Sequence, residues 1–419
     1  MQSKWQWLLL QLTRTLWLRA ALVGLLGVLV ALIALPLQDL ISRPIPFEIG
    51  SNAVDSILQI LATSMLTVTI FSLSVMVSAY NATSSGVTPR ATRLIKEDPT
   101  TQNVLAIFLG SFLFSLVGII ALSTDLYSDE GRFILFIATL AVIIWIVIAL
   151  LRWIEHLSRL GRVNNTTSQV EEKVQEALDE RIEMPSLGGH PIDDPSSIPE
   201  DATEIFSQQL GYVQHVDVNS LAQLAEENDT EIGVLALPGT LTHPSKPVAW
   251  YKGQSDETLE KAICNAFTID MERSYDQDPR FGLSVLAEIA SRALSPAMND
   301  PGTAIDVINR LTRLLLTFKG KNPEVKPDDI VHDRLHVATL SMKDMFEDGF
   351  LPIARDGAAI IEVQLRLQKA LRALKQSDCD LFGEEAQHIS ERALEYAEES
   401  NMLESDKQQL RDLNEQIKE

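Results

Sequence analysis

Four long apolar segments within the first 160 residues limit the folds open to this chain more than any other feature. They are Ala20–Leu37, Leu58–Tyr80, Val104–Leu122 and Phe133–Leu151. Each is long enough to cross the hydrocarbon layer of a bilayer, and none contains Asp, Glu, Lys, Arg or His. Because a chain in lipid must satisfy its backbone hydrogen bonds internally, these segments are expected to be helices. The sequence therefore predicts a four-span transmembrane domain at residues 1–160.

The basic residues around these spans predict the orientation of the chain. They gather near the N-terminus, after the second span and after the fourth span: Lys4, Arg14, Arg90, Arg93, Lys96, Arg152, Arg159 and Arg162. The loops at 38–57 and 123–132 hold only Arg43 and Arg132. Since Lys and Arg are enriched in cytoplasmic loops, both termini and the whole second half of the chain are expected in the cytoplasm.

The acidic charge of the chain lies almost entirely outside the predicted spans. The formal net charge is −22, yet residues 1–160 hold 10 Lys+Arg and 9 Asp+Glu, which leaves a net −23 for the remainder. A neutral apolar half followed by an acidic half indicates a membrane domain joined to a soluble one. Nucleic acid is not an expected partner, because phosphate binding requires a basic surface.

The soluble half divides by its patterns into three parts. Residues 161–202 predict a stalk helix followed by a linker rich in Pro, Gly, Ser and Asp, and residues 203–252 predict a small α/β strand module. The strands are expected at Tyr212–Val218, Glu231–Leu237 and Pro247–Tyr251. Residues 253–419 predict a cytosolic helical bundle with an acidic tail. Its helices are expected at Leu259–Met271, 283–318 (a pair), Asp328–Phe346, Pro352–Lys375, Glu384–Glu399 and Ser405–Lys418. The predicted fold is thus an α-helical membrane domain plus a cytosolic α+β domain.

The second span carries polar side chains along one helical face. They recur at three- and four-residue steps, and Phe71 stands in the one gap; the candidates to line a pore are Thr63, Thr67, Phe71, Ser74, Ser78 and Asn81. A hydroxyl-lined face interrupted by a ring is typical of a water-filled pathway with a hydrophobic constriction. The alternative is structural: Ser and Thr in membrane helices bond their own i−4 carbonyls or hold neighbouring helices.

A second polar stretch, at residues 272–311, lies in the soluble half. Pro296 and Pro301 predict that one helix ends near Leu294 and that the next begins with Asp300 as its N-cap. Arg273, Arg280 and Arg292 occur near Asp276, Asp278 and Asp300, so they either hold an anion or pair with these carboxylates to lock a helical hairpin. The candidate residues for this cytosolic polar site are Arg273, Asp278, Arg292, Ser295, Asn299, Asp300 and Thr303.

No motif in the chain predicts catalysis, a cofactor or a resident metal. The sequence contains no phosphate-binding loop, dinucleotide fingerprint, nucleophile elbow or CxxC pair, so no enzyme activity is predicted. His332 and His336 are four residues apart and could face one metal ion from a helix. No third potential ligand lies at a spacing typical of metal sites, so no metal site is predicted.

Two blocks of residues resemble a bacterial family of predicted membrane proteins, domain of unknown function 2254. The first includes Thr88-Pro89-Arg90, Asp98, Thr101-Gln102 and Phe108-Leu109-Gly110. The second includes Asp278-Pro279, Phe281-Gly282, Ile289-Ala290, Arg292–Pro296, Asn299–Pro301 and Thr303-Ala304. The resemblance implies a multi-span protein of the bacterial plasma (inner) membrane with a cytosolic domain, and it supplies no activity or catalytic residue.

Two functional hypotheses follow. In the first, the chain forms a homo-oligomeric pore for an ion or small solute, with the second span lining the axis and the cytosolic domain gating or assembling it. In the second, the membrane domain anchors a non-conducting sensor or scaffold that binds a small ligand or a protein through its cytosolic domain. The polar face of the second span favours the first hypothesis.

Overall fold

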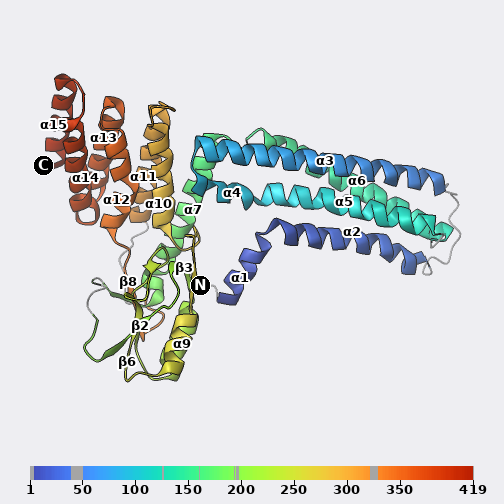
Figure 1. Ribbon diagram of the computed structural model, residues 1–419, viewed down its shortest axis with the longest axis horizontal. Coiled ribbons are helices and arrows are strands. Elements are labelled where there is room, and N and C mark those ends of the chain that lie inside the picture. The colour runs from blue at the N-terminus through green and yellow to red at the C-terminus, as the bar shows by residue number, and fades with distance from the viewer. Residues whose placement is uncertain are drawn as a thin grey trace. The chain divides into compact units, whose positions relative to one another are not determined.

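The computed structural model describes residues 4–38, 51–124, 127–159, 161–192, 194, 198–320 and 329–418. It divides into two compact units (Figure 1). The four-helix unit comprises Leu8–Ser85 and Thr92–Asn165. The α+β unit comprises the chain from Thr166 onward together with Gly86–Ala91 and the described residues up to Trp7.

The four-helix unit contains the apolar helices predicted from the sequence. The chain forms α1 (Lys4–Thr13), α2 (Leu16–Gln38), α3 (Ser51–Gly86), η1 (Pro89–Ala91), α4 (Thr92–Lys96), α5 (Pro99–Ser123) and α6 (Asp129–Leu157). Four of these, α2, α3, α5 and α6, are long and apolar enough to cross a membrane, which confirms four candidate spans. Several charges behind the orientation prediction, in 39–50 and 125–126, lie outside the described residues, so that orientation stays a prediction.

Small residues bring α2 and α5 close together. A Cβ atom added at Gly27 would lie 2.6 Å from the carbonyl oxygen of Gly110, and one added at Gly110 would lie 2.7 Å from Val23. Small residues of this kind allow helix backbones to approach in lipid. Beyond this contact, Leu58 of α3 packs with Phe114 of α5 and Leu135 of α6.

The α+β unit contains two sheets. The five-stranded sheet has the order β1 (His190–Ile192), β8 (Leu335–Ala338), β4 (Ile232–Val234), β6 (Pro247–Lys252) and β2 (Ala202–Phe206). The β8 strand pairs in parallel with β1 and β4, whereas β6 pairs antiparallel with β4 and β2. The three-stranded sheet has the order β5 (Leu241–Thr242), β3 (Gly211–Val216) and β7 (Phe267–Asp270). Helices α8 (Val218–Glu227) and α9 (Glu257–Asn265) complete this core.

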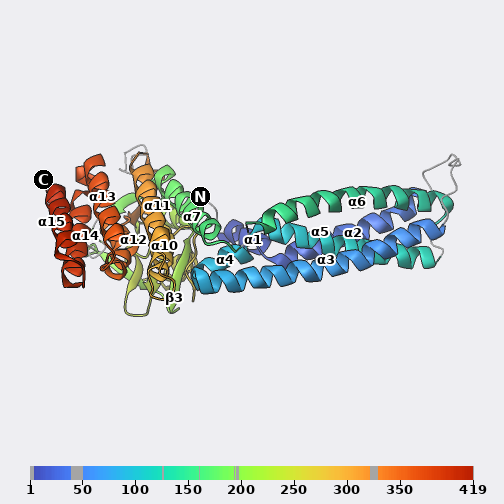
Figure 2. The same cartoon turned by 90° about the horizontal axis from the view of Figure 1, so that it is seen from above.

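Helices form the rest of the α+β unit. They are α7 (Val163–Glu183), α10 (Pro279–Ala293), α11 (Pro301–Gly320), α12 (Met342–Asp356), α13 (Ile361–Ser377), α14 (Cys379–Glu399) and α15 (Glu404–Lys418), with a short η2 (Pro185–Gly188) after α7. Both views show α13, α14 and α15 lying beside one another (Figures 1 and 2). The predicted hairpin boundary is confirmed: α10 ends at Ala293, α11 begins at Pro301, and Asp300 Oδ1 accepts a hydrogen bond from Thr303 N at 3.1 Å.

The strands extend well beyond the predicted module at 203–252. The predicted helix Leu259–Met271 ends at Asn265 and is followed by strand β7, and the predicted helix Asp328–Phe346 contains β8, while its first residue lies outside the described part. The linker expected before residue 203 contributes β1. These predictions were wrong because strands of three or four residues show no period of their own, and pairing with distant strands fixes them.

The predicted stalk helix is instead part of a packed core. Helix α7 buries Val170, Val174 and Leu178, and Val174 packs directly against Gly282 of α10. Glu171 of α7 pairs with Arg310 of α11 at 2.5 Å. An apolar stripe with such partners is buried against neighbouring helices, so α7 from Thr166 onward belongs to the α+β unit.

Candidate functional site

The polar row of the second span lies on a face of α3 that α2, α5 and α6 leave exposed. Thr63, Thr67, Ser74, Ser78 and Asn81 are all exposed in the described chain, whereas Leu58, Leu61 and Met65 of the same helix are buried in the four-helix unit. The structure thus places all the polar members of the predicted row on one outward surface.

Three of the four hydroxyl groups in this row donate to their own helix. Thr63 donates to the carbonyl of Gln59 at 3.0 Å, Thr67 to Thr63 at 2.9 Å, and Ser78 to Ser74 at 3.0 Å. Hydrogen bonds to the carbonyl four residues earlier are those expected if the hydroxyl groups have only a structural role. Each hydroxyl oxygen nevertheless keeps acceptor capacity on the outward side. The face therefore presents oxygen atoms without formal charge.

Two apolar side chains fill the gap in the row. Phe71 and Ile70 are each 61% exposed, and both lie between Thr67 and Ser74 along the helix. Phe71 was expected from the sequence, whereas Ile70 was not recognised. A polar face with an apolar step at its middle is the arrangement that the constriction hypothesis needs.

The segment that follows α3 is anchored in the α+β unit. Thr88 Oγ1 donates to Glu288 Oε2 at 2.8 Å, and Arg90 pairs with Glu288 Oε1 at 2.6 Å. The Tyr275 hydroxyl also donates to the carbonyl of Arg90 at 3.3 Å. Because Glu288 lies on α10, residues 86–91 are held by the helix that contains most of the second block, Asp278–Ala304.

Asp278 is the first residue of that block and stands immediately before α10. It is 3% exposed, accepts from Arg273 Nε at 2.8 Å and Nη2 at 2.9 Å, and caps α10 by accepting from Phe281 N at 3.0 Å. A Cβ atom added at Gly239 would lie 2.4 Å from Asp278 Oδ2, and the φ of Gly239 is +94°. The Pro238-Gly239 turn can therefore cover this carboxylate only with glycine at that position.

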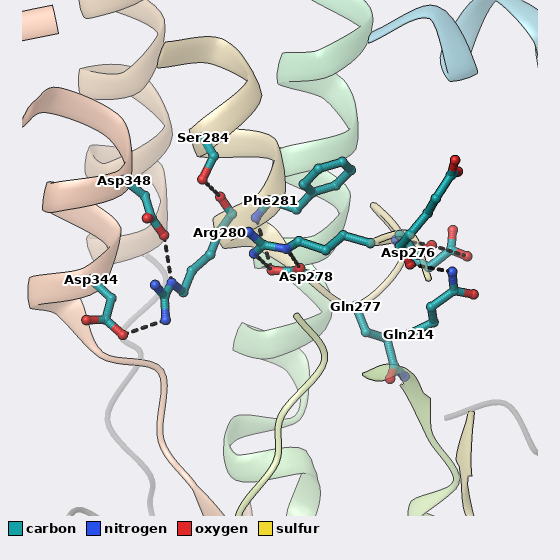
Figure 3. Close-up of polar contacts among 12 residues, drawn as sticks. Gln214, Asp276, Gln277, Asp278, Arg280, Phe281, Ser284, Asp344 and Asp348 are labelled. Carbon is teal, nitrogen blue, oxygen red and sulfur yellow. Dashed lines mark hydrogen bonds and ion pairs between the residues drawn. The ribbon is translucent and has the colours of Figure 1, made fainter. Parts of the chain in front are cut away.

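Arg280 makes ion pairs that the sequence did not predict. Its Nε bonds Asp348 at 2.8 Å and its Nη1 bonds Asp344 at 2.5 Å, so it joins α10 to α12 rather than to Asp276, Asp278 or Asp300 (Figure 3). The pairing prediction is confirmed only for Arg273 with Asp278. Asp276 accepts from the indole of Trp7 at 3.1 Å.

The remaining predicted residues lie far from Asp278. Arg292, Ser295, Asn299, Asp300 and Thr303 stand in and around the turn between α10 and α11, and Arg292 has no ion pair within the described residues. Since α10 has 15 residues, the two ends are about 22 Å apart. The structure therefore separates the candidates into a buried cluster at the start of α10 and an exposed turn after its end.

A buried arginine close to Asp278 was also not predicted from the sequence. Arg181 of α7 is 7% exposed and donates to the carbonyl of Gln277 at 3.4 Å. Burial lowers the pKa of Arg181 to about 10, while the charge of Asp278 opposes that shift. In the sequence, Arg181 stands among other charged residues in the segment predicted to be a stalk helix. Nothing in that pattern indicates that its side chain is buried.

A second missed cluster crosses the five-stranded sheet. His190 of β1 and His336 of β8 are cross-strand partners with ring centroids 5.2 Å apart, and His336 Nε2 lies 3.1 Å from Glu231 Oε2. Burial lowers the pKa of His336, and Glu231 partly offsets that effect. His332 and His336 are not on a helix, and no group of three metal-ligating side chains occurs among the described residues.

The fold defines a class: a membrane protein with four apolar helices and an α+β unit that contains the buried Asp278. Comparison with known families gives the particular assignment. The chain belongs to the family of predicted membrane proteins of domain of unknown function 2254, whose profile matches residues 13–373. This confirms the resemblance drawn from the sequence.

Relatives of the chain are uncharacterised. Proteins of Mycobacterium bovis and of Mycobacterium tuberculosis strain H37Rv are each 28% identical over 287 residues, covering 66% of this chain and 54% of theirs. A protein of M. tuberculosis strain CDC 1551 is 27% identical over the same length. The chain thus spans about half the length of these relatives. No solved structure gives a significant match.

Proposed function

We propose that this protein is a subunit of a homo-oligomeric pore of the bacterial inner membrane, in which the exposed face of α3 lines the pathway. The observation that carries the proposal is the row from Thr63 to Asn81 on a surface that the other membrane helices do not cover. A helix face directed at lipid is expected to be apolar, whereas this face carries the hydroxyl groups of Thr63, Thr67, Ser74 and Ser78 within the span Leu58–Tyr80.

Symmetric assembly provides a use for this face. One helix cannot enclose a lumen, whereas a ring of identical α3 helices would place the row around a common axis. The hydroxyl oxygens would then accept hydrogen bonds from water or coordinate a passing cation. Phe71, with Ile70, would narrow the pathway at an apolar step, where loss of water closes a pore.

The α+β unit is positioned along the chain to control this step. The segment held by Glu288 follows α3 without an intervening element, so a shift of α10 would act on the end of the pore-lining helix. We place the α+β unit in the cytoplasm, on the distribution of Lys and Arg around the spans.

Potassium efflux from proteoliposomes tests the proposal. We expect Phe71→Ala to raise efflux several-fold, because a smaller side chain leaves the apolar step hydrated. Leu73→Ala is the matched control: Leu73 is also exposed on α3, at 45%, but points about a quarter-turn away from the row. It should leave efflux unchanged.

Assembly is measured in parallel, on variants in which Cys264 and Cys379 are replaced by Ser. Ser74→Cys should form disulfide-linked dimers on mild oxidation, and Leu73→Cys should not. Cross-linked Ser74→Cys protein with no efflux from either wild type or Phe71→Ala would refute conduction. Equal cross-linking of the two cysteine variants would refute the arrangement around α3.

A further inference from the structure

The α+β unit contains a cavity of about 620 Å³ beside the first turn of α10. Its walls come from the Pro238-Gly239 turn, the end of β8, the first turn of α12 and the start of β6. Leu235, Leu237 and Leu340 give it an apolar side. A volume of this size is typical of sites for small organic molecules.

Three cationic side chains also line the cavity. Lys246, Arg273 and Arg280 contribute three positive charges. Arg273 is paired with Asp278, and Arg280 is paired with Asp344 and Asp348, so Lys246 is the one of these three cations without a carboxylate partner among the described residues. An unpaired lysine beside an arginine that keeps an unused N–H group offers both charge and hydrogen-bond donors to a single anionic group.

Two of these cations keep donors that the described residues do not use. Arg280 bonds Asp348 through Nε and Asp344 through Nη1, and no described residue bonds its Nη2. Lys246 Nζ makes no ion pair with any described residue and is exposed. Arg273, by contrast, is committed to Asp278 through two nitrogens.

The position of Arg280 is fixed before any ligand arrives. The two α12 carboxylates hold its guanidinium from two directions, as Figure 3 shows. A donor that is already immobilised costs little further conformational entropy on binding. The hydroxyls of Thr240 and Thr339 also line the cavity and can complete hydrogen bonds to the same group.

We propose that this cavity binds a small organic anion with one carboxylate or phosphate group on an apolar body. The anionic group is held between Lys246 and Arg280, and the apolar body contacts Leu235, Leu237 and Leu340. The carboxylates of Glu204 and Asp344, which also line the cavity, disfavour polyanions. The site is independent of conduction, since it is defined entirely within the α+β unit.

Calorimetric titration of the full-length protein in detergent tests the proposal, with phenyl phosphate as the probe. We expect binding to wild type, affinity reduced by about threefold to tenfold in Lys246→Gln, and no saturable heat with benzyl alcohol, which has the ring but no charge. Lys369→Gln is the matched control, because Lys369 is an exposed lysine on α13 away from the cavity.

A second variant separates the cavity from surface charge. Thr339→Trp puts an indole into the space while keeping every charge, so phenyl phosphate binding should be lost while the melting temperature stays within a few degrees of wild type. Wild-type affinity in both Lys246→Gln and Thr339→Trp overturns the proposal. An equal loss in Lys369→Gln also overturns it, because the probe would then respond to overall charge.

Discussion

At the scale of single residues, Asp278 makes contacts with several parts of the α+β unit. It caps α10, neutralises Arg273, lies close to the buried Arg181 and fits beneath the Gly239 turn. These contacts join α10 to α7 and to the turn between β4 and β5. Asp278 is almost fully buried, and each of its carboxylate oxygens accepts a hydrogen bond. We therefore expect it to contribute mainly to the stability of the fold.

Asp278→Asn isolates the charge of this residue from its role as a cap. Asparagine still accepts from Phe281 N, but it leaves the guanidinium of Arg273 without its carboxylate. We expect the free energy of unfolding of the α+β unit to fall by about 2 to 4 kcal/mol, below the range for a fully buried pair because Arg273 is 21% exposed. Denaturant titration of the full-length protein, followed by tryptophan fluorescence, measures the loss.

The chain offers a matched control for this substitution. Asp300 also caps a helix that begins with proline, but it is exposed and has no arginine partner within the described residues. Asp300→Asn should cost less than about 0.5 kcal/mol, since asparagine is an equally good cap. Equal losses in the two variants would show that capping, and not the buried charge, explains the Asp278 effect.

At the scale of elements, α10 connects three parts of the α+β unit. Its first turn carries Asp278 and Arg280, and Glu288, about 12 Å further along, holds the segment 86–91. The first turn also borders the cavity through Arg280. A single rigid helix is thus in contact with a ligand-sized space and with the segment that follows α3.

Glu288→Gln should loosen residues 86–91. The ion pair of Glu288 with Arg90 is partly exposed, at 35% and 57%, so its loss costs no more than about 1 kcal/mol. Local opening of the segment then becomes up to about fivefold more frequent, and trypsin cleavage after Arg90 accelerates by the same factor. Glu362→Gln, at an exposed position of α13, should leave the cleavage rate unchanged. An unchanged rate in Glu288→Gln would mean that other contacts hold the segment.

Elements with a local signal were predictable, and those fixed by distant partners were not. The pairs Asp98-Pro99 and Asp300-Pro301 each predict the start of a helix, and the structure has helices that begin at Pro99 and Pro301. Strand β8 has no such signal, because its four residues are ordered by pairing with β1, 146 positions earlier in register, and with β4. The partners of Arg280 lie 64 and 68 residues away on α12, which charge spacing alone could not indicate. The features that could not be predicted, in the fold and at the site, are therefore those that depend on contacts between residues far apart in the sequence.

At the scale of the whole molecule, charge and hydropathy divide between the two units. The four apolar helices belong to one unit, and the acidic remainder forms the other. Both cysteines, Cys264 and Cys379, lie in the α+β unit, and Cys379 is exposed. The native chain therefore carries a chemical reporter for the side of the membrane on which this unit resides.

Labelling with a membrane-impermeant maleimide tests the predicted orientation. In bacterial spheroplasts that express the protein, Cys379 should stay unlabelled, and in inverted membrane vesicles it should react fully, because the Lys/Arg distribution places the α+β unit in the cytoplasm. The control is Thr124→Cys in a chain whose two native cysteines are replaced by Ser. Thr124 is exposed at the end of α5, on the loop predicted to face outward, so its label should appear in spheroplasts. Labelling of Cys379 in intact spheroplasts at the rate seen after lysis would reverse the orientation and, with it, the side from which a ligand reaches the cavity.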